Sequence, residues 1–192
     1  MDRSIPDTAR EVLDFWLGEP PHVERPQWFR KDAAFDETIR SRFGATIAAA
    51  LAGAFGNWCT TPRGSLARVI VLDQFTRNAH RDTPLAFAGD ERALATALDV
   101  VDRGDDRELD QFERWFLYMP FEHSEDLRMQ ERSLALFGAL SADSGNPGAF
   151  EWAERHAAII RRFGRYPHRN AILGRASTPE EIAFLKQSGS GF

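Results

Sequence analysis

Residues 66–75 are mostly apolar, but two polar pairs lie at the end of this stretch and in the next helical turn. Asp73 and Arg77 are four residues apart, so a helix would place the carboxylate and the guanidinium on one face. Gln74 and Asn78 repeat the same spacing one residue later. Taking two charges out of water costs on the order of several kcal/mol each unless they are paired and hydrogen-bonded. These side chains therefore either brace the fold or line a pocket.

A second group is the segment PFEHSED at 120–126. We expect Pro120 to end one helix and Ser124 to cap the next. The segment also holds one histidine and three acids, namely His123, Glu122, Glu125 and Asp126. An imidazole beside carboxylates can exchange protons near neutral pH, and it can also ligate a metal. Acids are equally typical of any helix N-terminus, so structural, acid–base and metal interpretations stay open.

The third group is a basic span, residues 155–175, which contains six arginines and no acid in a chain of net charge −5. Residues 99–131 show the opposite bias, with eleven acids and four arginines. The two segments either pair with each other or the arginines form an anion pocket, because a guanidinium grips carboxylate or phosphate with two donors.

Within this basic span, the segment FGRYPHRN at 163–170 has the composition of a loop, since Gly164 and Pro167 favour a turn. It brings together Arg165, His168, Arg169 and Asn170, and loops on a rigid frame often carry function. His156 falls on the inner face of the preceding helix with Trp152, Ile159, Ile160 and Phe163, where we expect a core histidine.

The elements that position these groups are predicted to be helices, because strand and hairpin signals are nearly absent. The sequence predicts an all-α fold of eight to nine antiparallel helices in one domain, 1–192. The expected helices are 6–17, 32–52, one from Pro62 with Ser65 as a possible cap, one from Thr83-Pro84 to Gly104, 109–119, one opened by Ser124, one from Asn146-Pro147 through Phe163, a short one at 168–173, and 178–186.

Composition excludes several classes of protein. The chain has 192 residues and an acidic balance, which argues against general nucleic-acid binding. A single cysteine, Cys59, excludes an internal disulfide framework and a cysteine-cluster metal site. The longest uncharged apolar stretch, Trp115 to Phe121, is too short to span a bilayer, so we expect a soluble, cytoplasmic protein with no membrane association. Dinucleotide, P-loop and nucleophile-elbow motifs are absent from the sequence.

Five segments together resemble a bacterial family known as domain of unknown function 924. They are LDFWLGE (13–19), WFRKDAAFD (28–36), GSLARVIVLDQFTRN (64–78), FLYMPFEHSED (116–126) and FGRYPHRNAILGRASTPEE (163–181). The resemblance covers nearly the whole chain. It implies a tetratricopeptide-like array of helix pairs, although the tetratricopeptide signature itself is absent. It implies no reaction. One departure is Thr76, where the family pattern leads us to expect proline.

The leading hypothesis is a pocket for a small anionic ligand. Its ligand-binding residues would be Asp73, Arg77, Asn78, Arg165, Arg169 and Asn170. Its acid–base residues, should there be catalysis, would be His123, His168 and Glu125. The prediction includes no metal ligand and names no cofactor.

Two alternatives belong to other classes. A tetratricopeptide-like module would bind a peptide or a protein partner in an open apolar groove. In the second alternative, the arginines of 155–175 bind RNA. The acidic balance of the whole chain argues against this hypothesis. A homodimer is the default expectation for a bacterial protein.

Overall fold

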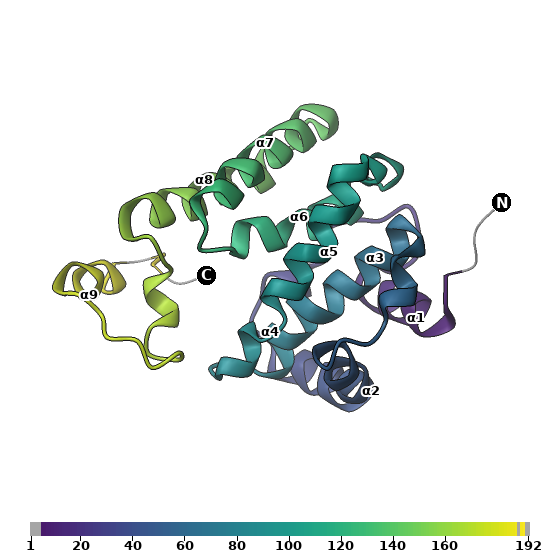
Figure 1. The fold of residues 1–192 in the computed structure, drawn as a ribbon, viewed down its shortest axis with the longest axis horizontal. Helices are drawn as coiled ribbons and strands as arrows, with labels where there is room; N and C mark the ends of the chain where they lie inside the picture. Colours follow the sequence, from purple (N-terminus) through teal and green to yellow (C-terminus); the bar gives the residue numbers. More distant parts are fainter. Residues whose placement is uncertain (1–4, 188, 191–192) are drawn as a thin grey trace. The chain divides into compact units, whose positions relative to one another are not determined.

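The computed structural model describes residues 5–187 and 189–190 (Figure 1). All the regular secondary structure in this part of the chain is helical, which confirms the all-α prediction. The antiparallel, tetratricopeptide-like arrangement stays a prediction. The α-helices are α1 (Asp7–Trp16), α2 (Ala33–Leu51), α3 (Pro62–Val69), α4 (Thr76–Ala79), α5 (Asp90–Arg103), α6 (Gln111–His123), α7 (Leu127–Ser144), α8 (Gly148–Phe163) and α9 (Pro179–Leu185). None of the helices described here is both long and apolar enough to cross a membrane.

The chain divides into two compact units. Unit 1 takes the chain up to Arg81 and again from Leu85 to Pro120, and unit 2 takes Asp82–Pro84 and the chain from Phe121 onward. The boundary falls inside α6, at Pro120. Whether the two units act as the single domain expected from length stays a prediction.

The centre of unit 1 is a wide, π-helical stretch, Ile70–Phe75, that continues α3 and leads into α4. All six of its side chains are buried, as the apolar sequence on every side of this helix predicts. Helices α1, α2 and α5 pack against it. Phe75 contacts the rings of Trp16 and Phe43, with ring centroids 5.7 and 4.8 Å apart. Aromatic packing of this kind carries most of the hydrophobic stabilisation of such a core.

Gly89 permits close packing of the chain just before α5 against this central stretch. A Cβ at Gly89 would lie 2.1 Å from the carbonyl oxygen of Leu72. The backbone angle of Gly89 is ordinary, with φ −91°, so the glycine is required for space and not for conformation. The sequence predicts one helix from Thr83-Pro84 to Gly104, but the structure divides it into a 3-10 turn, Pro84–Phe87, and α5. Gly89 lies just before α5, at the contact between backbones.

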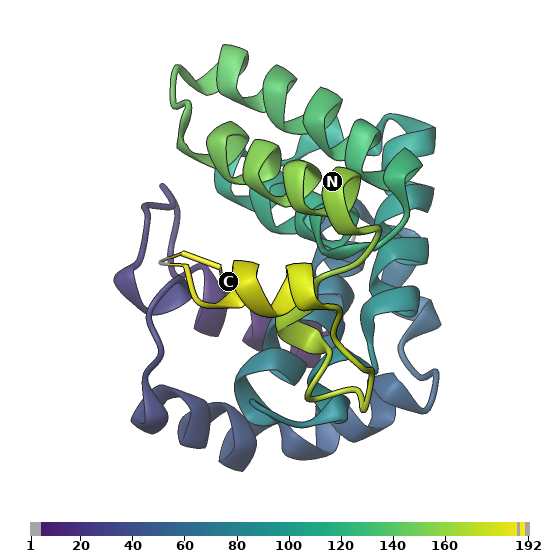
Figure 2. The same ribbon diagram turned by 90° about the vertical axis from the view of Figure 1, so that its left-hand side faces the viewer.

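Unit 2 is built on α7 and α8, which lie side by side in both views (Figures 1 and 2). Gly145, with φ 70°, ends α7, and Gly164, with φ 68°, ends α8. A 3-10 turn, Pro167–Arg169, and α9 follow. The side chains of Thr178 and Glu181 form a capping box at the start of α9, where the sequence predicts a helix over 178–186.

Three predicted helix boundaries are wrong. Helix α6 does not stop at Met119 but runs through Pro120 to His123, because the φ angle of proline is itself helical and one missing N–H is tolerated. Thr61, and not Ser65, caps α3, since Pro62 fits the first helical position. Asp126, and not Ser124, caps α7, because its carboxylate accepts the N–H of Arg128.

Two further details of unit 2 differ from expectation. The segment predicted as a helix over 168–173 is only the short 3-10 turn, followed by irregular turns. The sequence pattern predicts Trp152 on the inner face of α8, but its side chain is half exposed, whereas His156 one turn later is buried. A stripe that repeats every three to four residues drifts around the helix, so its ends need not share the buried face.

Replacing Gly89 by alanine tests the close backbone contact. We expect Gly89→Ala to destabilise the protein by about 2 kcal/mol, because the new methyl group has no room beside Leu72. Gly44→Ala is the matched control, since a Cβ there meets nothing within 4 Å inside α2. That change should stabilise the protein by roughly 0.5–1 kcal/mol. Urea denaturation of both variants measures the difference, and equal effects of the two changes would contradict the contact.

Candidate functional site

The residues predicted to form the site belong to different units. Asp73, Arg77 and Asn78 lie in unit 1. The other six lie in unit 2: His123, Glu125, Arg165, His168, Arg169 and Asn170. Each set is described by itself below.

In unit 1, Asp73 and Arg77 form the ion pair that their spacing predicts. Arg77 Nη1 lies 2.9 Å from Asp73 Oδ1, and the Asp73 side chain is completely buried. The guanidinium also makes two bonds to Asp90, of 2.8 and 3.0 Å. Gln74 Nε2 donates to Asp73 Oδ2 over 2.6 Å. One cation thus joins two carboxylates of the same unit, which is the arrangement expected of a brace.

Asn78 takes part in a second brace. Its side-chain oxygen accepts from Arg81 Nη2. Arg81 in turn makes two bonds to Asp36 at the start of α2, including one of 3.0 Å from Nη2 to Oδ1. Asn78 therefore fastens an arginine that joins α2 to the end of α4.

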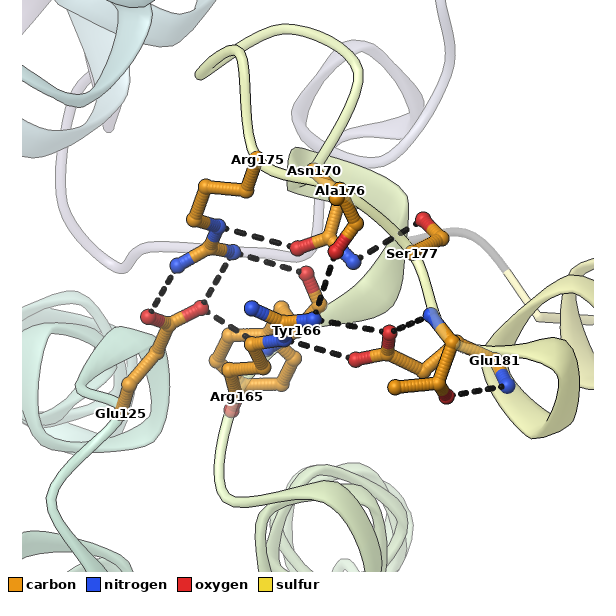
Figure 3. Close-up of polar contacts among 9 residues, drawn as sticks. Glu125, Arg165, Tyr166, Asn170, Arg175, Ala176, Ser177 and Glu181 are labelled. Carbon is orange, nitrogen blue, oxygen red and sulfur yellow. Dashed lines mark hydrogen bonds and ion pairs between the residues drawn. The ribbon is translucent and has the colours of Figure 1, made fainter.

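In unit 2, Glu125 and Arg175 anchor the segment that connects α8 to α9 (Figure 3). Arg175 donates to both oxygens of Glu125, over 2.7 and 3.0 Å. Asn170 Oδ1 accepts from Arg175 Nε, and the backbone N–H of Tyr166 donates to Glu125 over 2.7 Å. Burial alone would raise the pKa of Glu125, but the bonds from Arg175 and Tyr166 outweigh it and lower that pKa.

Arg165 is held by α9 on the other side of the same segment (Figure 3). It makes bonds of 2.7 and 2.9 Å to the two oxygens of Glu181 and one to the carbonyl of Ala176. The bond from Arg165 is the main reason that the pKa of Glu181 falls to about 2. The sequence left open whether the arginines of 155–175 pair with the acids of 99–131 or form an anion pocket. Arg175 does pair with Glu125 of that acidic segment, whereas Arg165 pairs with Glu181 outside it.

A cluster of imidazole, phenol and guanidinium groups shares Tyr166 with this network. We call it the histidine cluster, and its members are His123, His156, Tyr166, His168 and Arg169. The ring of His156 lies 6.2 Å from that of His123 and 5.6 Å from that of Tyr166. The Tyr166 ring lies 5.5 Å from that of His168, and the Arg169 guanidinium lies 4.6 Å above it. Arg169 Nη2 donates to the carbonyl of His123 over 3.0 Å.

His156 is the buried centre of the histidine cluster. Its Nδ1 lies 2.9 Å from the carbonyl oxygen of Trp152 and 3.5 Å from Glu122 Oε1. A carbonyl only accepts, so Nδ1 carries the proton and Nε2 the lone pair in the neutral ring. The pKa of His156 is lowered to about 3, chiefly by burial and in addition by electrostatic repulsion from His123, Arg169 and His168. The ring is therefore neutral at physiological pH.

Tyr166 links the cluster to α6 and α7. Its hydroxyl donates to the carbonyl of Glu122 over 2.5 Å and accepts from Gln130 Nε2 over 3.0 Å. Burial raises the pKa of this hydroxyl. Sequence reasoning did not single out Tyr166 or Gln130. The available signal was that the chain has only two tyrosines and that this one lies in the FGRYPHRN segment.

The comparisons with known proteins identify the family. The model of the family described as bacterial protein of unknown function (DUF924) matches residues 12–189. The chain belongs to the DUF924 family. A solved structure of a protein of unknown function from Agrobacterium tumefaciens is 37% identical and superposes with a TM-score of 0.85. The match covers 95% of this chain and 99% of that one. No curated protein matches this chain.

The burial of His156 predicts a dependence of stability on pH. The unfolded chain binds a proton on this ring near pH 6.5, whereas the folded protein binds it only near pH 3. The contribution of neutral His156 to the free energy of unfolding is therefore fully present above about pH 6.5. It is lost as the pH falls below about 6.5, by about 1.4 kcal/mol per pH unit. His156→Gln should remove this contribution. Urea denaturation between pH 4 and 7.5 compares the two slopes, and identical slopes would contradict the assignment.

The Glu125–Arg175 pair predicts a second stability effect. Arg175→Gln should destabilise the protein by about 1–3 kcal/mol, because it leaves a half-buried carboxylate without its cation. Arg128→Gln is the control, since Arg128 pairs with Asp126 on the surface of the same unit. We expect no measurable change in the melting temperature of that variant. Calorimetry of both variants measures the effect, and it contradicts the prediction if Arg175→Gln melts like the wild type.

Proposed function

We propose that unit 2 binds a small anionic ligand at the histidine cluster. The supporting observation is that His156, His168 and Arg169 lie against Tyr166, and that a third histidine of the five in the chain, His123, lies against His156. Burial is the main cause of the lowered pKa of His156, and electrostatic repulsion from His123, Arg169 and His168 adds to it. An anion is the chemical class that such a site favours.

The members of the site have different roles in this proposal. His123 and His168 are partly exposed and would contact the ligand, while Arg169 supplies a buried positive charge behind them. Arg165, Asn170 and Glu125 act as positioning residues, because their polar atoms already hold the segment between α8 and α9. The proposal rests on unit 2 alone, and a contribution of Asp73, Arg77 and Asn78 to the same ligand stays a prediction.

The site also offers proton transfer once a ligand is bound. An imidazole that a ligand can reach serves as a general acid or base. His123 and His168 are the candidates, since His156 is held neutral in the interior. Glu125, the carboxylate expected from the sequence to assist them, is committed to Arg175, whereas Glu122 lies 3.5 Å from His156.

A thermal-shift screen with small carboxylates, inorganic phosphate and sulfate tests the proposal. A ligand at a hundred times its dissociation constant should stabilise the protein by about 2.7 kcal/mol, which raises the melting temperature by roughly 5–10 °C. His168→Gln and Arg169→Gln should abolish the shift. Arg161→Gln should keep it, because Arg161 is an exposed arginine of α8.

Two results would contradict the proposal. One is a screen in which no anion raises the melting temperature of the wild type, which would favour the helical interaction module instead. The other is a shift of equal size in the wild type and in His168→Gln, which would place the bound anion elsewhere on the chain.

A further inference from the structure

Unit 1 holds a cluster of metal-ligating side chains that the proposed function does not use. His22 lies in the loop after α1, and Asp110 and Glu113 lie at the start of α6. Each of the three offers one ligand atom, and these atoms all lie within 4.8 Å of one another. Loop and helix therefore bring an imidazole and two carboxylates together across 88 residues of sequence.

The burial of the three side chains suits a bound ion. The side chains of His22 and Glu113 are 3% and 6% exposed, so two ligands are withdrawn from competing water. The side chain of Asp110 is 42% exposed and leaves an approach from solvent. His22 Nδ1 lies 2.5 Å from Asp110 Oδ2, so the imidazole nitrogen already faces a carboxylate oxygen.

We propose that His22, Asp110 and Glu113 bind a divalent cation of the zinc class. One imidazole nitrogen and two carboxylate oxygens form a ligand set that Zn²⁺ accepts, with a fourth position left for water or for another ligand. Magnesium is disfavoured, because it prefers oxygen ligands in octahedral geometry.

Asp110 and Glu113 also cap the N-terminus of α6, and this second role limits how tightly they can bind a cation. Asp110 Oδ1 accepts the N–H groups of Phe112 and Glu113, and Glu113 Oε2 accepts the N–H of Asp110. Asp110 Oδ2, which faces His22, is not used by this cap. Arg63 Nε lies 2.8 Å from Glu113 Oε1, and its side chain is 40% exposed, so it can turn into solvent when a cation takes its place. Competition with Arg63 and with the positive helix terminus lowers the affinity that we expect for the cation.

The charge of the neighbouring segment favours a cation. Residues 99–109 contain five acids and two arginines, and they lead directly into Asp110. A local negative potential raises the concentration of cations near the site. The resulting attraction offsets part of the competition from Arg63.

Isothermal titration of the full chain with Zn²⁺ tests the site, with Mg²⁺ as the second probe. We expect one saturable Zn²⁺ site, and we expect His22→Gln to raise the dissociation constant at least tenfold. Asp110→Asn should do the same while it preserves the helix cap, since asparagine also caps helices well. His80→Gln removes a histidine elsewhere in unit 1 and should leave binding unchanged.

The variants distinguish a metal site from a purely structural contact between His22 and the start of α6. Circular dichroism at the same pH shows whether His22→Gln and Asp110→Asn stay folded, and Asp110→Asn keeps the test valid if His22→Gln does not. Absence of saturable Zn²⁺ binding, or equal binding by the wild type and Asp110→Asn, would overturn the proposal and leave His22 as the residue that fastens its loop to α6.

Discussion

A charge inside a helical interior must be matched by an opposite charge or by hydrogen bonds, and this constraint governs both units. Helices satisfy their own backbone groups, so they contribute few partners for a buried ion. The chain supplies them from side chains instead. Asp73 is completely buried because Arg77 and Gln74 both bind it. The carboxylates of Glu125 and Glu181 are each matched by an arginine of the segment that connects α8 to α9.

The segments that look like separate motifs in the sequence are parts of one arrangement in unit 2. PFEHSED supplies Glu122 and Glu125, and the segment after α8 supplies Tyr166 and Arg175 that bind them. In FGRYPHRN the two groups proposed to bind a ligand lie between two bracing groups. Arg165 and Asn170 hold the segment, whereas His168 and Arg169 lie beside Tyr166. A rigid segment is what a preorganised site requires.

The histidine cluster depends on the same bracing. Tyr166 contacts His156 and His168 and is fixed at its hydroxyl, at its N–H and at its carbonyl. Each of these bonds comes from a different element, namely the end of α6, the turn before α7 and the segment before α9. The neutral state of His156 follows from this packing, because it excludes water and places positive charges nearby.

The sequence by itself determined the helical class, most helix ends, the capping box of α9 and the Asp73–Arg77 pair. These features depend on contacts within a few residues, where spacing and residue type decide the geometry. Tertiary structure alone decided that Asp90 shares Arg77, that Arg165 pairs with Glu181, and that Tyr166 and Gln130 complete the cluster around His156. Tertiary structure also decided that α6 continues past Pro120. These outcomes depend on which distant side chains the packing brings together, and no local pattern records that choice.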